Sequence, residues 1–387
     1  MVKLLPIDMD YTVDVLLRLL NTPSPTGRTD DVMHLLGGEL RTLGLPFEMS
    51  RRGALIANLS SDGATSPQRA LFVHADTLGC MVRRIKPNGR LEVAAIGTFS
   101  ARSAEGGRVI IFTDEPGVTY TGTILPLKAS GHAFGDEIDM QKTAWANVEV
   151  RIDAFTSSID ETIALGIQIG DFIAFDALPV VTPTGGFIKS RHLDGKAGVA
   201  AALGAIKALL DARIEPPVGT HLLITIAEEV GYGASSGLHA DVAETLAIDT
   251  GVVAPGQSST EDAVSVCMQD SSGPMDYHLT RKLLNLARDL DIPVRREVYR
   301  YYRSDSASAL EAGAEMRGAL IGFGVDATHG HERTHLDGIR RVSELTAAYL
   351  QTPLTFEEWD ESRTGALEDF PGQMDERSTR PPRSRRG

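Results

Sequence analysis

Two adjacent glutamates, Glu228 and Glu229, follow an apolar run that extends from His221 to Ala227. Side chains alternate along a strand, so neighbours at its end point in different directions and can take different roles. One carboxylate could bind a metal ion while the other moves a proton, which is the division that a metal-assisted hydrolase requires. A solvated strand end is the plain alternative for this pair taken alone, because glutamates are usually exposed.

Residue types that bind metal ions stand at four other places, each where a predicted strand ends or a predicted helix begins. They are His74 with Asp76, Asp194, Asp249 and His329. Zinc and its neighbours favour imidazole nitrogen and carboxylate oxygen, and this mixture suits two metal ions bridged by one carboxylate. His74 and Asp76 stand two apart and share a face of a strand, so Asp76 could accept the other ring N–H of His74.

Each of these residues also has an ordinary structural explanation. His74 and Asp76 could form a polar strand end, Asp194 could cap the helix that follows it, and Asp249 could form a turn. A single histidine such as His329 is more often a surface residue than a ligand. No one of these residues decides the question by itself.

The composition is that of an ordinary globular protein. The chain has 387 residues, of which 42% are hydrophobic and 23% charged, enough for one large domain or two moderate ones. The formal net charge of -14 argues against general nucleic-acid binding, because phosphate contacts need clustered Lys and Arg. The basic run at 377–387 lies among Pro and Ser and is typical of a frayed tail.

The chain carries the features of a protein of the reducing cytoplasm. Its two cysteines, Cys80 and Cys267, cannot form a disulfide framework. Acidic residues and a proline interrupt the first 20 residues, so we expect no signal peptide there. No stretch approaches the roughly 18 apolar residues of a membrane span, and we expect no membrane partner.

The elements that must position these residues form an α/β fold with an inserted β-rich unit. Helical spacing predicts helices over 9–21 and 30–45, and short apolar runs predict strands at 54–59 and 70–74. Between 80 and 183, short apolar runs alternate with Gly, Pro, Asp and Asn, which is typical of a small all-β domain. We therefore expect a discontinuous main domain at 1–79 and 184–355, and a tail at 356–387 without fixed structure.

After residue 184 the sequence again alternates strands and helices. A helix is predicted from Asp194 to about 212, and a strand ends at the two glutamates. A second helix is predicted at 236–243, and a strand reaches Asp249. This succession predicts a central mixed, mostly parallel sheet flanked by helices. Ligands of such sheets bind beyond the carboxyl ends of the strands, where these acidic residues stand.

The ordered segments resemble a known family. HAD at 74–76, LDGKAG at 193–198, AEEVG at 227–231, AIDTG at 247–251 and THGHE at 328–332 are similar to the motifs of the M42 glutamyl and tetrahedral aminopeptidases. These enzymes are dinuclear metallopeptidases related to other co-catalytic zinc exopeptidases. The resemblance covers roughly residues 10–350, and the inserted β-rich segment fits the family's architecture.

The resemblance implies a role for each residue. His74 and Asp249 would bind one ion, Glu229 and His329 the other, and Asp194 both. Glu228 would be the general base that takes a proton from a bridging water, and Asp76 would orient His74. Two divalent ions are implied as cofactors, with zinc favoured and cobalt or manganese as alternatives.

The sequence departs from the family pattern at three places. Thr77 and Leu78 stand in the first motif, and Gly195 replaces an acidic residue after Asp194. The last ligand is open among His329, His331 and His335. His329 is preferred because it follows the final predicted strand as the family's histidine does.

The resemblance also implies substrates and partners. An aminopeptidase of short peptides is expected, with self-association through the inserted domain, based on dimers and often reaching a tetrahedral dodecamer. The THGHERTH segment resembles a subgroup linked to the osmolyte N-acetylglutaminylglutamine amide, which implies a small dipeptide substrate containing Gln or Glu. The alternatives are a dinuclear deacetylase or desuccinylase of N-acyl amino acids, and a catalytically silent scaffold.

Overall fold

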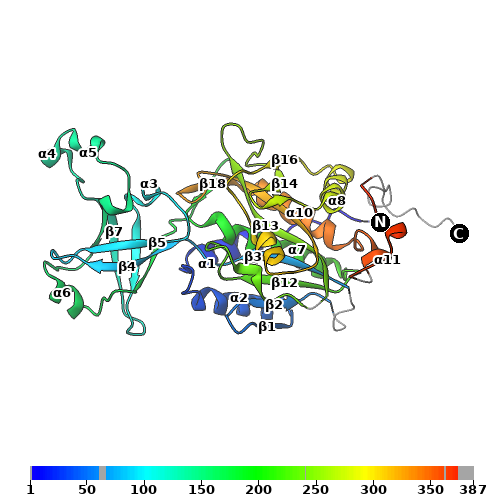
Figure 1. Cartoon of the computed structure of the whole chain (residues 1–387), viewed down its shortest axis with the longest axis horizontal. Coiled ribbons are helices and arrows are strands. Elements are labelled where there is room, and N and C mark those ends of the chain that lie inside the picture. Colours follow the sequence, from blue (N-terminus) through cyan, green and yellow to red (C-terminus); the bar gives the residue numbers. More distant parts are fainter. Residues whose placement is uncertain (1, 61–66, 240, 361–362, 374–387) are drawn as a thin grey trace.

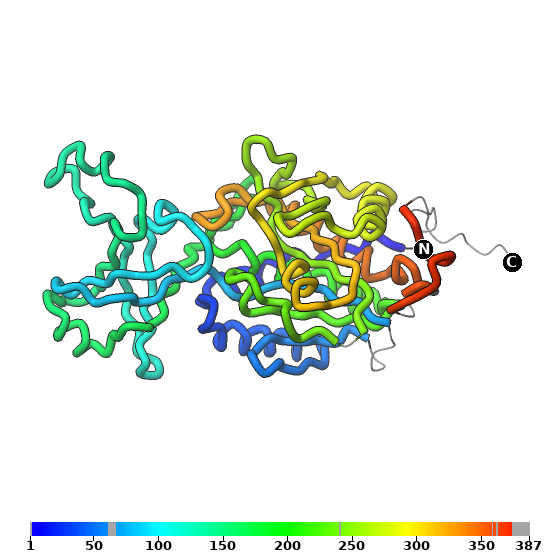
Figure 2. The backbone as a smooth tube through the Cα atoms, viewed as in Figure 1, coloured from blue at the N-terminus to red at the C-terminus, as the bar shows by residue number. Residues whose placement is uncertain are grey.

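The chain folds into two lobes that lie side by side along the long axis of the molecule (Figure 1). The computed structural model describes residues 2–60, 67–239, 241–360 and 363–373. The larger lobe is built on one sheet of 12 strands, and the smaller lobe is a closed barrel. The backbone leaves the larger lobe after residue 74 and returns before residue 187, so the barrel is an insertion (Figure 2).

The sheet of the larger lobe has a parallel centre. Its main path, in spatial order, is β1 (Phe47–Met49), β2 (Leu55–Asn58), β12 (Thr220–Thr225), β3 (Gln68–His74), β13 (Val242–Val253), β17 (Arg317–Asp326), β18 (Glu332–His335), β11 (Phe187–Ser190) and β10 (Val180–Val181). Beside β17 lie β14 (Val264–Asp270), β15 (Gly273–Pro274) and β16 (Val294–Val298). β12, β3, β13 and β17 pair in parallel, so their carboxyl ends meet at one edge. The prediction of a mixed, mostly parallel core is confirmed.

Helices cover both faces of this sheet. They are α1 (Met9–Leu20), α2 (Asp30–Thr42), α7 (Leu193–Ala212), α8 (Tyr277–Asp289), α9 (Asp305–Glu311), α10 (Leu336–Leu350) and α11 (Glu357–Asp360), with short 3-10 turns η2 (Gly233–Ser235) and η3 (Leu367–Asp369). The Ala-rich α7 is buried along most of its length and packs between α1, α10 and the sheet. Small side chains let α7 approach the strands closely, which fixes its first turn against their carboxyl ends.

The smaller lobe is an antiparallel barrel with its own core. Its strands close in the order β4 (Gly79–Ile85), β5 (Leu91–Ile96), β8 (Val148–Ile152), β7 (Thr119–Pro126), β6 (Arg108–Phe112) and β9 (Phe172–Phe175). Its short helices are α3 (Ala101–Ala104), α4 (Gly131–Phe134), α5 (Glu137–Met140), α6 (Ile159–Ala164) and η1 (Trp145–Asn147). Inward residues such as Val82, Ile111 and Val150 are buried together. The small all-β unit is confirmed, although β10, within the expected 80–183 segment, joins the large sheet; the domain boundaries stay a prediction.

Two local predictions were wrong. No helix occupies 236–239 or 241–243, because η2 is followed by an irregular segment and then by β13. Residue 240 lies outside the described residues. Asp249 does not end its strand either, since β13 continues to Val253 and pairs Asp249 with Gly322.

The C-terminal segment is partly ordered. α11 and η3 lie in the stretch for which we expected no fixed structure, and Phe356 is buried there. Residues 361–362 and 374–387, which also belong to that prediction, lie outside the described residues. Within the described ranges, no helix has both the length and the apolar character needed to cross a bilayer.

Candidate metal centre

The five predicted metal ligands, the predicted general base Glu228 and Asp76 gather at the carboxyl edge of the parallel strands. His74 ends β3, Asp76 follows it, Glu228 and Glu229 follow β12, Asp249 lies in β13, Asp194 opens α7, and His329 lies between β17 and β18. These residues are separated by up to 255 positions in the chain, from His74 to His329. The parallel register of the strands is what brings them together.

One group of three ligands surrounds the ring of His74. Its Nε2 lies 3.2 Å from Asp194 Oδ1 and 4.0 Å from Asp249 Oδ1. Each of the three side chains offers a ligand atom, and these atoms lie within 4.8 Å of one another. All three residues are buried, so a cation held here would be shielded from solvent.

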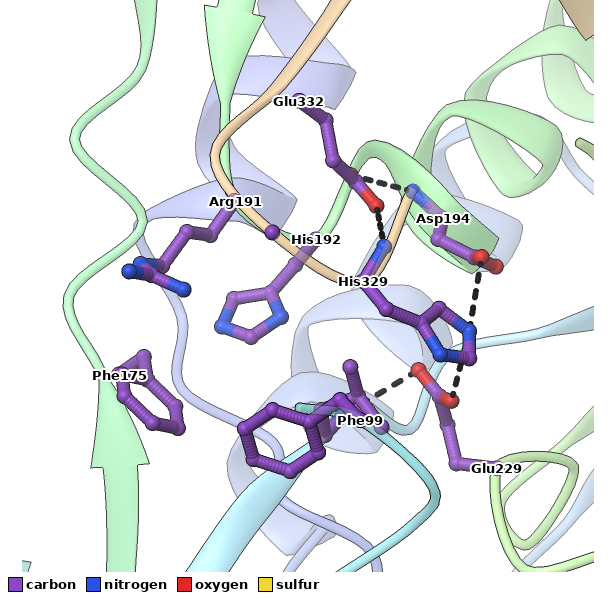
Figure 3. A pocket seen from close by; sticks show the side chains of 10 residues that line it. Phe99, Phe175, Arg191, His192, Asp194, Glu229, His329 and Glu332 are labelled. Carbon is purple, nitrogen blue, oxygen red and sulfur yellow. Dashed lines mark hydrogen bonds and ion pairs between the residues drawn. The ribbon is translucent and has the colours of Figure 1, made fainter. Parts of the chain in front are cut away.

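A second, more open group surrounds the ring of His329. Its Nε2 lies 3.4 Å from Asp194 Oδ2 and 3.7 Å from Glu229 Oε2. Dashed lines mark both contacts in Figure 3. His329 Nδ1 is 2.8 Å from the carbonyl oxygen of Thr98, which fixes the ring. Asp194 thus directs one carboxylate oxygen to each histidine.

Of the three candidate histidines, only His329 reaches Asp194. His331 is exposed. His335 caps α10 and directs its Nε2 to the carbonyl oxygen of Gly185, at 2.7 Å.

The backbone at the start of α7 presents Asp194 to both histidines. Asp194 and Gly195 have non-helical dihedral angles, and Gly195 has a φ of 78°. A Cβ at Gly195 would lie 2.4 Å from Cε1 of His74, so no side chain fits there beside this ring. The glycine that departs from the family pattern is required by the close approach of His74 in this structure.

Asp76 holds the loop of the two glutamates. Its carboxylate accepts hydrogen bonds from the backbone N–H groups of Glu228 (3.2 Å) and Glu229 (3.3 Å), and from the hydroxyl of Thr26 (2.7 Å). The ring of His74 is closer to the backbone carbonyl of Asp76, at 3.1 Å, than to its carboxylate, at 3.5 Å. Asp76 therefore contacts the ring of His74 and fixes the loop that carries Glu228 and Glu229.

Glu332 is a residue of the site that the sequence did not single out. Its carboxylate accepts from the backbone N–H of His329 at 2.9 Å and of Asp194 at 3.1 Å. His329 has a φ of 63°, which is uncommon for a residue with a side chain. The buried carboxylate offsets that strain and fixes the spacing of Asp194 and His329.

Glu332→Gln is expected to lower the free energy of unfolding by about 1–3 kcal/mol, because the amide nitrogen would face a backbone N–H and leave it unpaired. Glu261→Gln is the matched control, since the Glu261 carboxylate is more exposed and pairs with the guanidinium group of Arg333. Glu261→Gln should lower the free energy of unfolding by less than about 1 kcal/mol. Urea unfolding of the two variants checks this, and equal losses would contradict the role of Glu332.

The acidic residues of the site repel one another. Burial and the charge of Asp194 raise the pKa of Asp249 to about 7, and burial raises the pKa of Glu228 and of Glu229 well above the usual range. Burial opposes charge on Asp194 too, but hydrogen bonds from His329 and His74 hold its pKa far below the ordinary value. Divalent cations would relieve this repulsion, so the donors present fit metal ions.

A hollow opens beside the second group, between the barrel and the larger lobe (Figure 3). The residues that line it are Leu78, Phe99, Phe175, Arg191, His192, Asp194, Glu229, His329, Gly330 and Glu332. Aromatic side chains come from the barrel, and charged ones come mainly from the larger lobe. A substrate in this hollow would lie against both lobes.

Asp305, Tyr301 and Tyr302 belong to neither ligand group. Asp305 is buried, accepts from the backbone N–H of Ala234 at 2.8 Å and from the hydroxyl of Thr225 at 2.5 Å, and so anchors the segment after the two glutamates. Tyr301 is 94% exposed. Tyr302 packs edge-on against Tyr299, and burial together with the charge of Asp249 raises its pKa.

Comparisons with known proteins agree with this geometry. The model of the M42 glutamyl aminopeptidase family matches residues 53–345. YhfE of Bacillus subtilis (strain 168), which carries the provisional name of an aminopeptidase, is 39% identical over 343 residues, which are 89% of this chain and 98% of YhfE.

Two solved structures share the fold. A TET aminopeptidase from a marine sediment Thaumarchaeota archaeon superposes with a TM-score of 0.80 at 19% identity, covering 88% of this chain and 96% of its own. The TET1 peptidase of Pyrococcus horikoshii superposes with a TM-score of 0.76 at 21% identity, covering 87% and 98%. The family match and the similarity to YhfE show that this chain is a peptidase, and it belongs to the M42 glutamyl aminopeptidase family.

Proposed function

We propose that this protein is a dinuclear metal-dependent aminopeptidase that removes N-terminal residues from short peptides. The observation that carries the proposal is the carboxylate of Asp194, which directs one oxygen to His74 and the other to His329. A carboxylate placed between two imidazole nitrogens has the geometry of a bridging ligand.

Five residues would hold the two ions. His74 and Asp249 would bind one, Glu229 and His329 the other, and Asp194 both. Imidazole and carboxylate donors suit zinc, and cobalt or manganese accept the same ligands. When bound, the ions would polarise the peptide carbonyl and make a water molecule more acidic.

Glu228 is the proposed general base. It belongs to neither ligand group, and its backbone N–H is fixed by Asp76. Burial raises the pKa of Glu228 well above that of a free glutamate, and the charges of Asp249 and Asp305 act in the same direction. A more basic carboxylate takes a proton from water more readily, and can then deliver it to the leaving amine.

Peptides with a free α-amino group are expected to be cleaved, whereas the same peptides with an N-acetyl cap are not. The carboxylate of Glu332 lines the hollow outside both ligand groups and attracts an ammonium group. The preference should be roughly 10- to 100-fold or more in kcat/KM, the worth of a charged hydrogen bond.

Matched free and N-acetylated dipeptides, assayed with the metal-loaded protein, give the comparison. Cleavage of only the N-acyl compounds would instead assign the site to a deacetylase or desuccinylase. Absence of turnover on both sets would favour the silent scaffold.

We also propose that the protein acts as a homo-oligomer in the cytoplasm. The barrel exposes large apolar side chains, among them Phe155 and Met140, which are 109% and 82% exposed. Large apolar side chains that are exposed in this way can pack against another chain. The P. horikoshii peptidase can assemble into a tetrahedron or a large octahedral shell, which supports a large homo-oligomer. We propose that this assembly is based on dimers and extends to a dodecamer. Two buried cysteines without disulfides fit a reducing compartment.

A further inference from the structure

Arg191 lines the hollow beside the proposed metal centre but belongs to neither ligand group. It lies three residues before Asp194, and its guanidinium group stands with the ring of Phe175 on the side of the hollow away from Glu229 (Figure 3). The distance from its Cζ to the centre of the Phe175 ring is 4.8 Å. Its place between the lobes puts a positive charge where the far end of a small substrate would lie.

This charge has no carboxylate partner among the described residues. Arg191 donates one hydrogen bond, from Nη2 to the carbonyl oxygen of Ser103 at 2.7 Å, and forms no ion pair within 4.0 Å with that part of the chain. Glu332 contributes a favourable charge, but both its oxygens accept backbone N–H groups of Asp194 and His329. Burial lowers the pKa of Arg191, because the charged guanidinium group loses contact with water.

A half-buried guanidinium without a counter-ion is costly unless an anion joins it. The planar group presents several N–H donors in a fork that matches a carboxylate. The aromatic rings of Phe99 and Phe175 beside it keep water away from the pair and strengthen the attraction.

We propose that Arg191 binds a carboxylate of the substrate and so makes the enzyme selective for small acidic peptides. The carboxylate is either the C-terminal group of a dipeptide or the side chain of an acidic residue. This inference rests on the proposed aminopeptidase function, and it assigns the substrate class of the same site.

The plain alternative is that Arg191 only ties the barrel to the larger lobe. The chain provides a matched control for this role. Arg28 also belongs to the larger lobe and stacks on a barrel ring, with its Cζ 3.7 Å from the centre of Phe112. Arg28 differs in that it pairs with Asp31 and does not line the hollow.

The test uses two matched pairs of substrates with the metal-loaded wild type and the variants Arg191→Gln, Arg191→Lys and Arg28→Gln. Ala-Ala and Ala-Ala amide differ in the C-terminal carboxylate. Glu-Ala amide and Gln-Ala amide differ in the side-chain carboxylate. We expect the wild type to prefer the acidic member of one pair by about 10- to 100-fold in kcat/KM, which is the worth of a charge-assisted hydrogen-bonded pair.

Arg191→Gln should bring that ratio close to one, mainly through KM, Arg191→Lys should keep part of it, and Arg28→Gln should leave it unchanged. The substrate pair whose kcat/KM ratio changes in Arg191→Gln shows whether Arg191 binds the C-terminal carboxylate or the side-chain carboxylate. An equal loss on charged and neutral substrates, or an unchanged ratio, would overturn the inference.

A binding measurement separates this inference from the proposed function. Calorimetry with glutarate, and with its neutral diamide as reference, needs no turnover. Glutarate should bind the wild type and Arg28→Gln about 10- to 100-fold more tightly than Arg191→Gln. Equal binding to all three proteins would reject Arg191 as the carboxylate site even if peptides are cleaved, and the expected difference would support it even if they are not.

Discussion

Asp194→Asn is expected to reduce the bound metal from two ions per chain to one or none, and to lower kcat/KM by about 10³-fold or more, since a bound metal supplies several kcal/mol of transition-state stabilisation. Asn has the size of Asp but offers a single oxygen without charge. It cannot serve the ring nitrogens of both His74 and His329, which lie 3.2 Å and 3.4 Å from the two oxygens of Asp194. Elemental analysis of protein equilibrated with zinc and then freed of excess metal, together with peptidase assays, measures both quantities.

Asp276→Asn is the control for this experiment. Asp276 caps α8, with its carboxylate accepting from the backbone N–H of Leu279, and asparagine caps helices about as well as aspartate. This variant should keep both ions and full turnover. If Asp194→Asn behaved in the same way, Asp194 would be an ordinary residue at a helix start and the dinuclear proposal would be wrong.

Glu228→Gln is expected to lower kcat by about 10²- to 10⁴-fold, the usual contribution of a general base, and to leave the metal content unchanged. The amide has nearly the same shape as the carboxylate but cannot accept a proton. Glu228 contributes no atom to either ligand group, so the site should keep its ions. Stopped assays at saturating peptide, paired with elemental analysis, test the two halves of this prediction.

Glu229→Gln provides the contrast at the neighbouring position. Glu229 Oε1 accepts from the backbone N–H of Leu78, and Oε2 faces His329. This change should therefore weaken metal binding as well as turnover. A Glu228→Gln protein that retained turnover, or that lost metal as Glu229→Gln does, would require the two roles to be reassigned.

Much of the site was predictable because metal ligands are few in type and parallel strands end at one edge. His74 and the two glutamates follow apolar runs that form β3 and β12, and α7 begins where the Ala-rich run predicts. These are local properties of the chain, since the periodicity of apolar residues encodes strands and helices. The same reasoning failed at 236–239 and 241–243, where composition suited a helix but an irregular segment follows η2 and leads to β13.

The sequence by itself determined the α/β architecture, the inserted β-rich unit and the set of candidate ligands. Only the tertiary structure showed which candidate side chains meet: Asp194 lies between the rings of His74 and His329, and the carboxylate of Glu332 accepts the backbone N–H groups of Asp194 and His329. It also showed Arg191 unpaired among the described residues that line the hollow. The physical reason is that secondary structure follows from neighbours in the chain, whereas the meeting of side chains more than 100 positions apart depends on strand register and on the packing of α7 against the sheet.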